Sequence, residues 1–134
     1  MAMLSTKYKT FNIKENTSKH LLDEMNKEFA FDFDPCPENP TFNGLEADWK
    51  GSIYCNPPYG KAIRAWLEKG LSEIKRGNAD SIVYLLPAYP DVKWFHEIVL
   101  PIADEIRFLK GRLKFGSHNQ SAPFASMLVI FRRK

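Results

Sequence analysis

The segment from Ser81 to Leu86 constrains the fold most, because it is almost entirely apolar over the length of one strand. Continuous apolar strands are typical of parallel sheets that are covered on both faces. The chain before it places apolar residues at helical spacing, namely Ile63, Trp66, Leu67, Leu71 and Ile74. A strand that follows a helix in this way predicts an α/β fold, with a mostly parallel sheet covered by helices.

Periodicity and turn residues predict the other elements along the chain. In order, they are an irregular segment at 1–16, a helix from Thr17 (or Ser18) to about Glu28, a strand from Phe29 to Asp34, an extended loop over 35–50, a strand from Ser52 to Cys55, a helix from about Asp91 to Leu100, and strands at 105–109, 113–115 and 125–131. The last strands are expected to form a C-terminal antiparallel hairpin. The 134 residues are expected to form a single domain.

Composition excludes several classes of protein. No apolar run reaches the roughly 18 residues of a membrane helix, and no secretory signal pattern is present. Two cysteines do not suggest a disulfide framework, so a cytoplasmic chain with free thiols is expected. His20, His96 and His118 do not combine with the cysteines at zinc spacing, and no metal site is expected.

The charge of the chain is distributed unevenly. Residues 1–105 contain 12 Lys or Arg and 16 Asp or Glu, whereas residues 106–134 contain seven Lys or Arg and no acid. Such an excess suggests a surface that faces a polyanion. A solvated basic edge with a frayed tail would give the same pattern.

The tetrapeptide Asn56-Pro57-Pro58-Tyr59 lies between an expected strand and an expected helix that begins near Lys61. The prolines remove two backbone donors and leave carbonyls free to accept. The Asn56 side-chain oxygen and a proline carbonyl can accept both hydrogens of one amino group, and Tyr59 offers a face to a flat ring. Although such residues also mark ordinary turns, this context favours a site that methylates an amino group on a base.

Three of the expected strands end in residues suited to a site. Asp34, Asn56 and the pair Pro87-Ala88 each follow a strand. Ligands of open α/β sheets bind outside the carboxyl ends of the strands. These residues are therefore expected to lie together at one end of the sheet.

Several separated motifs resemble the phage-type DNA N6-adenine methyltransferases, the Dam family of phages and prophages. The motifs that carry the resemblance are Asp34-Pro35-Cys36-Pro37, Asn56-Pro57-Pro58-Tyr59, Gly111-Arg112-Leu113-Lys114-Phe115 and Ala122-Pro123-Phe124. The resemblance implies an abbreviated class I (Rossmann-like) sheet, S-adenosylmethionine as methyl donor, and the N6 amino group of adenine in double-stranded DNA as acceptor. It also implies a phage or prophage protein in the cytoplasm of a bacterial host. The small size of the chain suggests a short DNA target or help from a second subunit, as in a homodimer.

The resemblance also implies roles for individual residues. Asn56, Pro57, Pro58 and Tyr59 would form the catalytic motif. The donor-binding residues would be Thr17, Asp34, Pro35 and Cys36, with Asp48 as the candidate for the acid that binds ribose. The glycine-rich turn usual after the first strand is replaced by Pro37-Glu38-Asn39-Pro40, which puts the donor contacts in question.

The basic loop from Gly111 to Phe124 is expected to contact DNA phosphates, mainly through Arg112 and Lys114. Arg112 could instead pair with an acid within the fold. Lys61 and Arg64 are weaker candidates, since exposed helix charges are usually only solvated.

Two other functions fit the same residues. Cytosine N4 and a glutamine amide also present an NH₂ group on a conjugated carbon, so the tetrapeptide suits their methylation equally well. The missing glycine-rich turn motivates the other alternative, a non-catalytic nucleic-acid-binding module.

Overall fold

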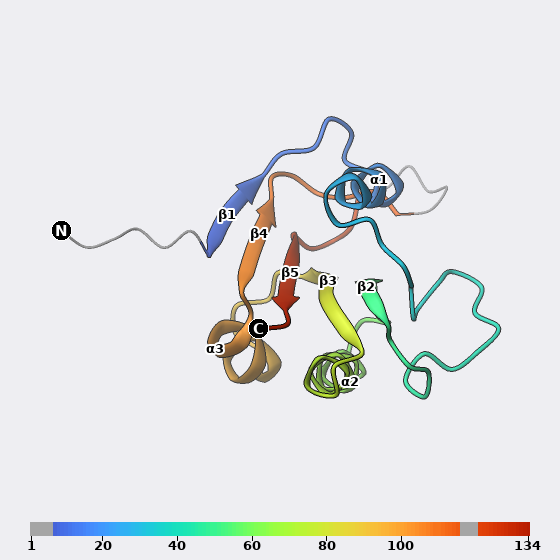
Figure 1. Cartoon of the computed structure of the whole chain (residues 1–134). Helices are drawn as coiled ribbons and strands as arrows, with labels where there is room; N and C mark the ends of the chain where they lie inside the picture. The colour runs from blue at the N-terminus through green and yellow to red at the C-terminus, as the bar shows by residue number, and fades with distance from the viewer. Residues whose placement is uncertain (1–6, 116–120) are drawn as a thin grey trace.

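The computed structural model describes residues 7–115 and 121–134, and this part of the chain builds one five-stranded sheet. In chain order the strands are β1 (Tyr8–Phe11), β2 (Gly51–Cys55), β3 (Ala79–Pro87), β4 (Glu105–Leu109) and β5 (Ser126–Arg132). Across the sheet their order is β1-β4-β5-β3-β2. Figure 1 shows α1 (Ser18–Phe29) on one face and the remaining helical segments on the other, namely α2 (Ile63–Lys75), η1 (Phe95–Val99) and α3 (Leu100–Ile102).

Four of the strands point in the same direction. β1 pairs in parallel with β4, and β2 pairs in parallel with β3. β5 is antiparallel to both of its neighbours, β3 and β4. The carboxyl ends of β1, β2, β3 and β4 therefore lie at one end of the sheet, which we call the rim.

The prediction of an α/β fold is confirmed, but the sheet is mixed rather than mostly parallel. Its pairings divide equally between parallel and antiparallel, because β5 is inserted between β3 and β4. The expected antiparallel pairing of the two C-terminal strands is present. It does not form a separate hairpin, since β5 continues the sheet to β3.

Alternate side chains of the central strands are buried on opposite faces. On β3, Ile82, Tyr84 and Leu86 belong to the core beneath α2 and η1, whereas Val83 and Leu85 pack in the core beneath α1. Full burial of each such aliphatic side chain contributes about 1.5–3 kcal/mol. The continuous apolar run thus reflects a strand that is covered on both faces.

The helix expected from Thr17 is confirmed. The position of its end explains why the strand expected from Phe29 to Asp34 does not form. Thr17 caps α1 by accepting a hydrogen bond from the His20 N–H, with a distance of 3.1 Å. Phe29 is still helical, and Ala30 reverses the chain in the left-handed conformation (φ 49°). Only Phe33 of the expected strand pairs with β2, as a single bridge to Ile53.

Three other expectations need correction. The segment 1–16 is not wholly irregular, because Tyr8–Phe11 form β1 through pairing with a strand about a hundred residues away; residues 1–6 lie outside the described part. The helix expected near 91–100 is present over 93–102, but its centre is π-helical, with η1 running directly into the short α3. Of the strand expected at 113–115, only Lys114 makes isolated bridges. The remaining helix and strands are confirmed, and residues 35–50 form neither a helix nor a strand.

Candidate active site

The rim brings together residues that are far apart in the sequence. Asn56 follows β2, and Asp34 follows a short extended segment beside β2. That segment is held by three backbone hydrogen bonds: the Asp32 N–H and the Phe33 N–H both donate to the Ser52 oxygen (2.7 and 3.3 Å), and the Tyr54 N–H donates to the Phe33 oxygen (3.1 Å). Asp34 and Asn56 therefore leave adjacent extended segments at the same end of the sheet.

The first cavity at the rim, which we call the aromatic hollow, has a volume of about 340 Å³ and is lined by Asn56, Pro57, Tyr59, Phe115 and Phe124. Cavities of a few hundred Å³ are typical of small-molecule sites. Within the described part of the chain, the half-buried Asn56 amide has no hydrogen-bond partner, and no group donates to the Pro57 carbonyl. Both acceptors are therefore available to a ligand. Pro58 is exposed and does not line the hollow.

Three aromatic rings form the walls of this hollow. The Tyr59 ring lies 5.3 Å from that of Phe124 and 6.5 Å from that of Phe115, both in edge contacts. The Tyr59 hydroxyl donates to the Leu85 carbonyl at 3.2 Å, which fixes the ring against the end of β3. Burial raises the pKa of Tyr59, so its hydroxyl stays neutral. These apolar surfaces suit a flat ring.

Sequence reasoning did not assign Phe115 and Phe124 to the site. Both aromatic residues end short motifs of the basic loop, namely Gly111–Phe115 and Ala122–Phe124. The aromatic residue at the end of each motif was the sequence signal that could have found them.

The second cavity, which we call the acidic hollow, has a volume of about 320 Å³. Residues from α1, from the chain after it and from β2 line it: Leu22, Asp23, Asn26, Phe31, Asp32, Phe33, Asp34 and Tyr54. No residue lines both hollows. However, Tyr54 lines the acidic hollow and Asn56, two residues further on, lines the aromatic one, so the end of β2 contributes to both.

Two carboxylates of the acidic hollow are held by the backbone. Asp34 accepts from the Cys36 N–H at 2.9 Å, and Asp32 accepts from the Ser52 N–H at 2.8 Å. Burial raises the pKa of Asp34 above its ordinary value. No cationic side chain among the described residues pairs with either carboxylate. A partly buried carboxylate without a cation suits a ligand that brings hydroxyl or cationic groups.

The other residues predicted to bind the donor differ in their positions. Pro35 is buried, and Cys36 packs against the core and donates its N–H to Asp34, so neither lines the hollow. Thr17 lies at the rim, where it forms a bridge with Lys114. Asp48 is exposed and precedes β2, at the opposite end of the sheet, with an oxygen 3.8 Å from Arg76. The structure does not bring Asp48 to the other predicted residues.

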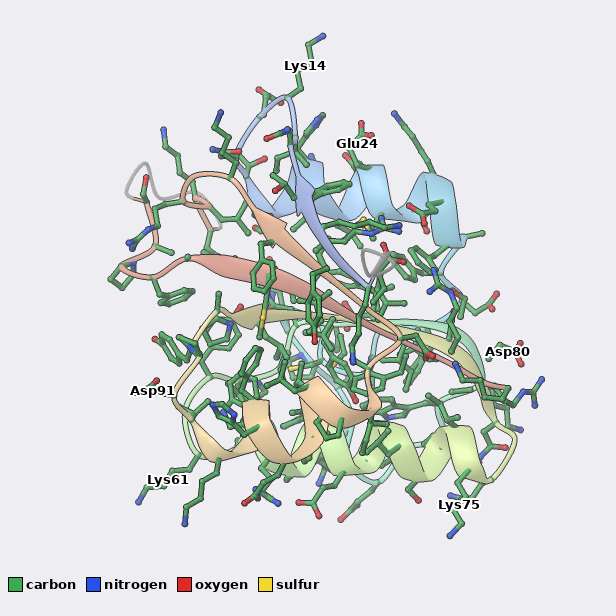
Figure 2. The ribbon with its side chains drawn as sticks, turned by 90° about the vertical axis from the view of Figure 1, so that its left-hand side faces the viewer. Lys14, Glu24, Lys61, Lys75, Asp80 and Asp91 are labelled. Atoms are coloured by element: carbon green, nitrogen blue, oxygen red, sulfur yellow. The ribbon has the colours of Figure 1, made fainter. Side chains whose placement is uncertain are left out.

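Lys61 and Arg64 lie at the rim end of α2. Figure 2 shows Lys61 and Asp91 at one end of the molecule and Lys75 and Asp80 at the other. Arg64 is engaged by acids, with Glu97 at 2.7 Å and Glu68 at 3.5 Å.

The basic C-terminal segment is partly neutralised within the fold. Four of its cations pair with acids, namely Arg107, Arg132, Arg133 and Lys134. Arg112 instead donates to the Ala122 carbonyl at 3.4 Å, and Lys114 is exposed. Neither contacts an acid in the described part of the chain. The predicted basic loop from Gly111 to Phe124 includes residues 116–120, which lie outside that part.

The described residues contain no group of three or more His, Cys, Asp and Glu that could hold a metal ion. Within the same part of the chain, none of the helices has the length and apolar character needed to span a membrane.

Comparison with known families adds to this geometry. An α/β sheet with a hollow at the carboxyl ends of its strands has the arrangement in which open α/β sheets hold their ligands. The family model described as DNA N-6-adenine-methyltransferase (Dam) matches residues 9–134, and the chain belongs to this family. The family is one of enzymes that methylate adenine in DNA, and the mixed sheet is compatible with a methyltransferase fold without being clearly Rossmann-like. Searches of the curated proteins and of the solved structures found no match.

Proposed function

We propose that this protein transfers a methyl group from S-adenosylmethionine to the N6 amino group of adenine in double-stranded DNA. One observation carries the proposal: the Asn56 amide and the Pro57 carbonyl, without partners in the described part of the chain, line a hollow with aromatic walls. Family membership favours adenine over cytosine N4 or a glutamine amide.

The aromatic hollow would bind the target base. A base in a duplex must leave the stack before an enzyme can modify it, at a cost of a few kcal/mol. Contact with the rings of Tyr59, Phe115 and Phe124 offsets this cost, since stacking on an aromatic side chain contributes about 1–3 kcal/mol per base. The aromatic walls thus favour the extruded base.

Asn56 and Pro57 would prepare the amino group for reaction. The lone pair of an exocyclic amine on a purine is delocalised into the ring, which makes the nitrogen a poor nucleophile. When the Asn56 oxygen and the Pro57 carbonyl accept its two hydrogens, the nitrogen can become tetrahedral and direct its lone pair outward. Alignment of two bound reactants supplies up to about 7–11 kcal/mol in ideal cases. No strong general base is needed for this role.

The acidic hollow would bind the donor. S-adenosylmethionine carries a cationic amino-acid group, a sulfonium, ribose hydroxyls and a purine. The carboxylates of Asp23, Asp32 and Asp34 suit the cationic and hydroxyl groups, and the rings of Phe31 and Phe33 suit the purine. The residues therefore fit the donor, which supplies an activated methyl group when bound. Asp48 is not part of this proposed site, because it lies at the other end of the sheet.

The proposal is tested by incubating the protein with methyl-labelled donor and defined duplex oligonucleotides, and identifying the modified nucleoside. Labelled N6-methyladenine supports the proposal. Label in cytosine, or in protein substrates alone, would show that another amine is the acceptor. DNA binding without methyl transfer, and without heat of donor binding in calorimetry, would indicate a non-catalytic binding module.

The setting of this activity is part of the proposal. A phage or prophage enzyme would act in the cytoplasm of its bacterial host, and a homodimer would enlarge the DNA surface of so short a chain. Sedimentation of the protein with and without a duplex measures whether it dimerises.

A further inference from the structure

The loop between β1 and α1, residues 12–17, lies directly against the chain that leaves β4. Three backbone hydrogen bonds hold the two segments together: from the Lys110 N–H to the Phe11 oxygen (3.3 Å), from the Lys114 N–H to the Asn16 oxygen (2.8 Å), and from the Ser18 N–H to the Lys114 oxygen (3.0 Å). Gly111 adopts a positive φ of 82°, and a Cβ there would collide with the Asn16 amide. The two segments therefore form one continuous surface at the rim.

This surface is rich in cations that no acid neutralises. Lys14, Lys110, Arg112 and Lys114 are all exposed, and none pairs with a carboxylate in the described part of the chain. Figure 2 shows Lys14 projecting from the tip of the loop. The acid within the loop, Glu15, lies 3.7 Å from the His20 imidazole. We call the four cations the basic corner.

The basic corner differs from the other cations of the C-terminal segment. Arg107, with its bidentate contact to Glu28, and Arg132 are already used to hold the fold together. The basic corner makes no such ion pair. It also adjoins the aromatic hollow, because Phe115 lines that hollow and directly follows Lys114.

We propose that the loop between β1 and α1 is part of the DNA-binding surface, with Lys14 and Lys110 contacting the phosphate backbone beside Arg112 and Lys114. The inference rests on the proposed function, since it supplies the surface on which the duplex lies while one base enters the aromatic hollow. Four exposed cations on two adjoining segments suit the regular charge of a duplex, and phosphate contacts position the protein without reading sequence.

The test measures how DNA affinity depends on salt. Each phosphate contact contributes about 0.9 to the slope of log affinity against log salt. The double variant Lys14→Gln/Lys110→Gln should therefore have a slope shallower by about 1.8, for duplexes of unrelated sequence alike. Between 50 and 200 mM KCl, its loss of affinity should be roughly 12-fold smaller than that of the unmodified protein.

The matched control is Lys50→Gln/Lys75→Gln, which removes the same charge from exposed lysines at the other end of the sheet. The control should keep the original slope. An unchanged slope in the Lys14/Lys110 variant, or an equal change in the control, would overturn the inference. The proposed function is judged separately, by the methyl-transfer activity of the unmodified protein. If this activity is present but the salt slope of the Lys14/Lys110 variant is unchanged, only the proposed DNA-binding surface is rejected. If the slope of the variant is shallower but the unmodified protein transfers no methyl group, only the proposed enzymatic activity is rejected.

Discussion

Replacement of Asn56 by alanine is expected to slow methyl transfer without changing the stability of the fold. The Asn56 side chain has no hydrogen-bond partner in the described part of the chain and is only half buried, so Asn56→Ala should change the free energy of unfolding by less than about 0.5 kcal/mol. Loss of one preorganised hydrogen-bonding group from an active site costs about 100- to 1000-fold in turnover, or about 2.7–4 kcal/mol. The variant should therefore fold normally and methylate slowly.

The assay is single-turnover methyl transfer to a duplex oligonucleotide, with urea unfolding of the same protein sample. Asn56→Asp is the informative partner, because a carboxylate keeps an acceptor oxygen at this position. It should retain at least about tenfold more activity than Asn56→Ala, a difference of about 1.4 kcal/mol. Equal rates for the two variants would refute the acceptor role, and full activity of Asn56→Ala would remove Asn56 from the mechanism.

Replacement of a second asparagine, Asn43, should have the opposite effect, with a loss of stability and no change in methyl transfer. Asn43 lies in the loop over 35–50, lines neither hollow, and accepts a hydrogen bond from the Leu45 N–H at 3.0 Å. Asn43→Ala should cost about 0.5–1.5 kcal/mol of stability through the lost hydrogen bond and leave methyl transfer unchanged. This control shows whether a small loss of stability alone slows the reaction.

Three further predictions follow from contacts at and beyond the site. Tyr59→Phe removes the hydrogen bond to the Leu85 carbonyl but keeps the ring, so calorimetry should show a stability loss of about 0.5–1.5 kcal/mol while DNA affinity stays unchanged. Asp34→Asn should raise the stability at neutral pH, because burial raises the pKa of this carboxyl and its ionised form destabilises the fold; the same change should weaken S-adenosylmethionine binding in titration calorimetry. The hydrogen bond from Arg107 lowers the pKa of Glu28 below its ordinary value of 4.5. The stability that ionised Glu28 contributes is therefore fully present above pH 4.5 and is lost as the pH falls through the lowered pKa. Urea unfolding across this pH range should show a smaller acid-induced loss of stability for Glu28→Gln than for the unmodified protein.

Much of the fold could be predicted because several helices and strands have clear local sequence patterns. The apolar run of β3 and the helical spacing in α2 are strong signals, and both elements form where expected. β1 could not be predicted in the same way. Its four residues, Tyr-Lys-Thr-Phe, have no apolar run, and they form a strand because β4 offers a parallel partner. Pairing over so long a sequence separation leaves no local pattern to read.

The lining of the candidate site could be predicted where the lining residues follow one another in a single segment of the sequence. Asn56, Pro57 and Tyr59 line one hollow, as their order between a strand and a helix had suggested. The acidic hollow was harder, because half of its lining comes from the alternating segment Phe31-Asp32-Phe33-Asp34, which resembles a strand. The chain reversal at Ala30 leaves these residues beside α1, with a single bridge to β2. Their alternation thus places side chains around a cavity rather than across a sheet.

The reversed direction of β5 explains how the aromatic hollow is completed. β4 ends at the rim, and β5, being antiparallel to it, must begin at the rim. The connection between them therefore starts and finishes beside Asn56, and its two ends supply Phe115 and Phe124. A parallel last strand would have carried the chain to the far end of the sheet before it could pair. The feature that makes the sheet mixed is thus the one that brings two distant phenylalanines to the proposed base-binding site.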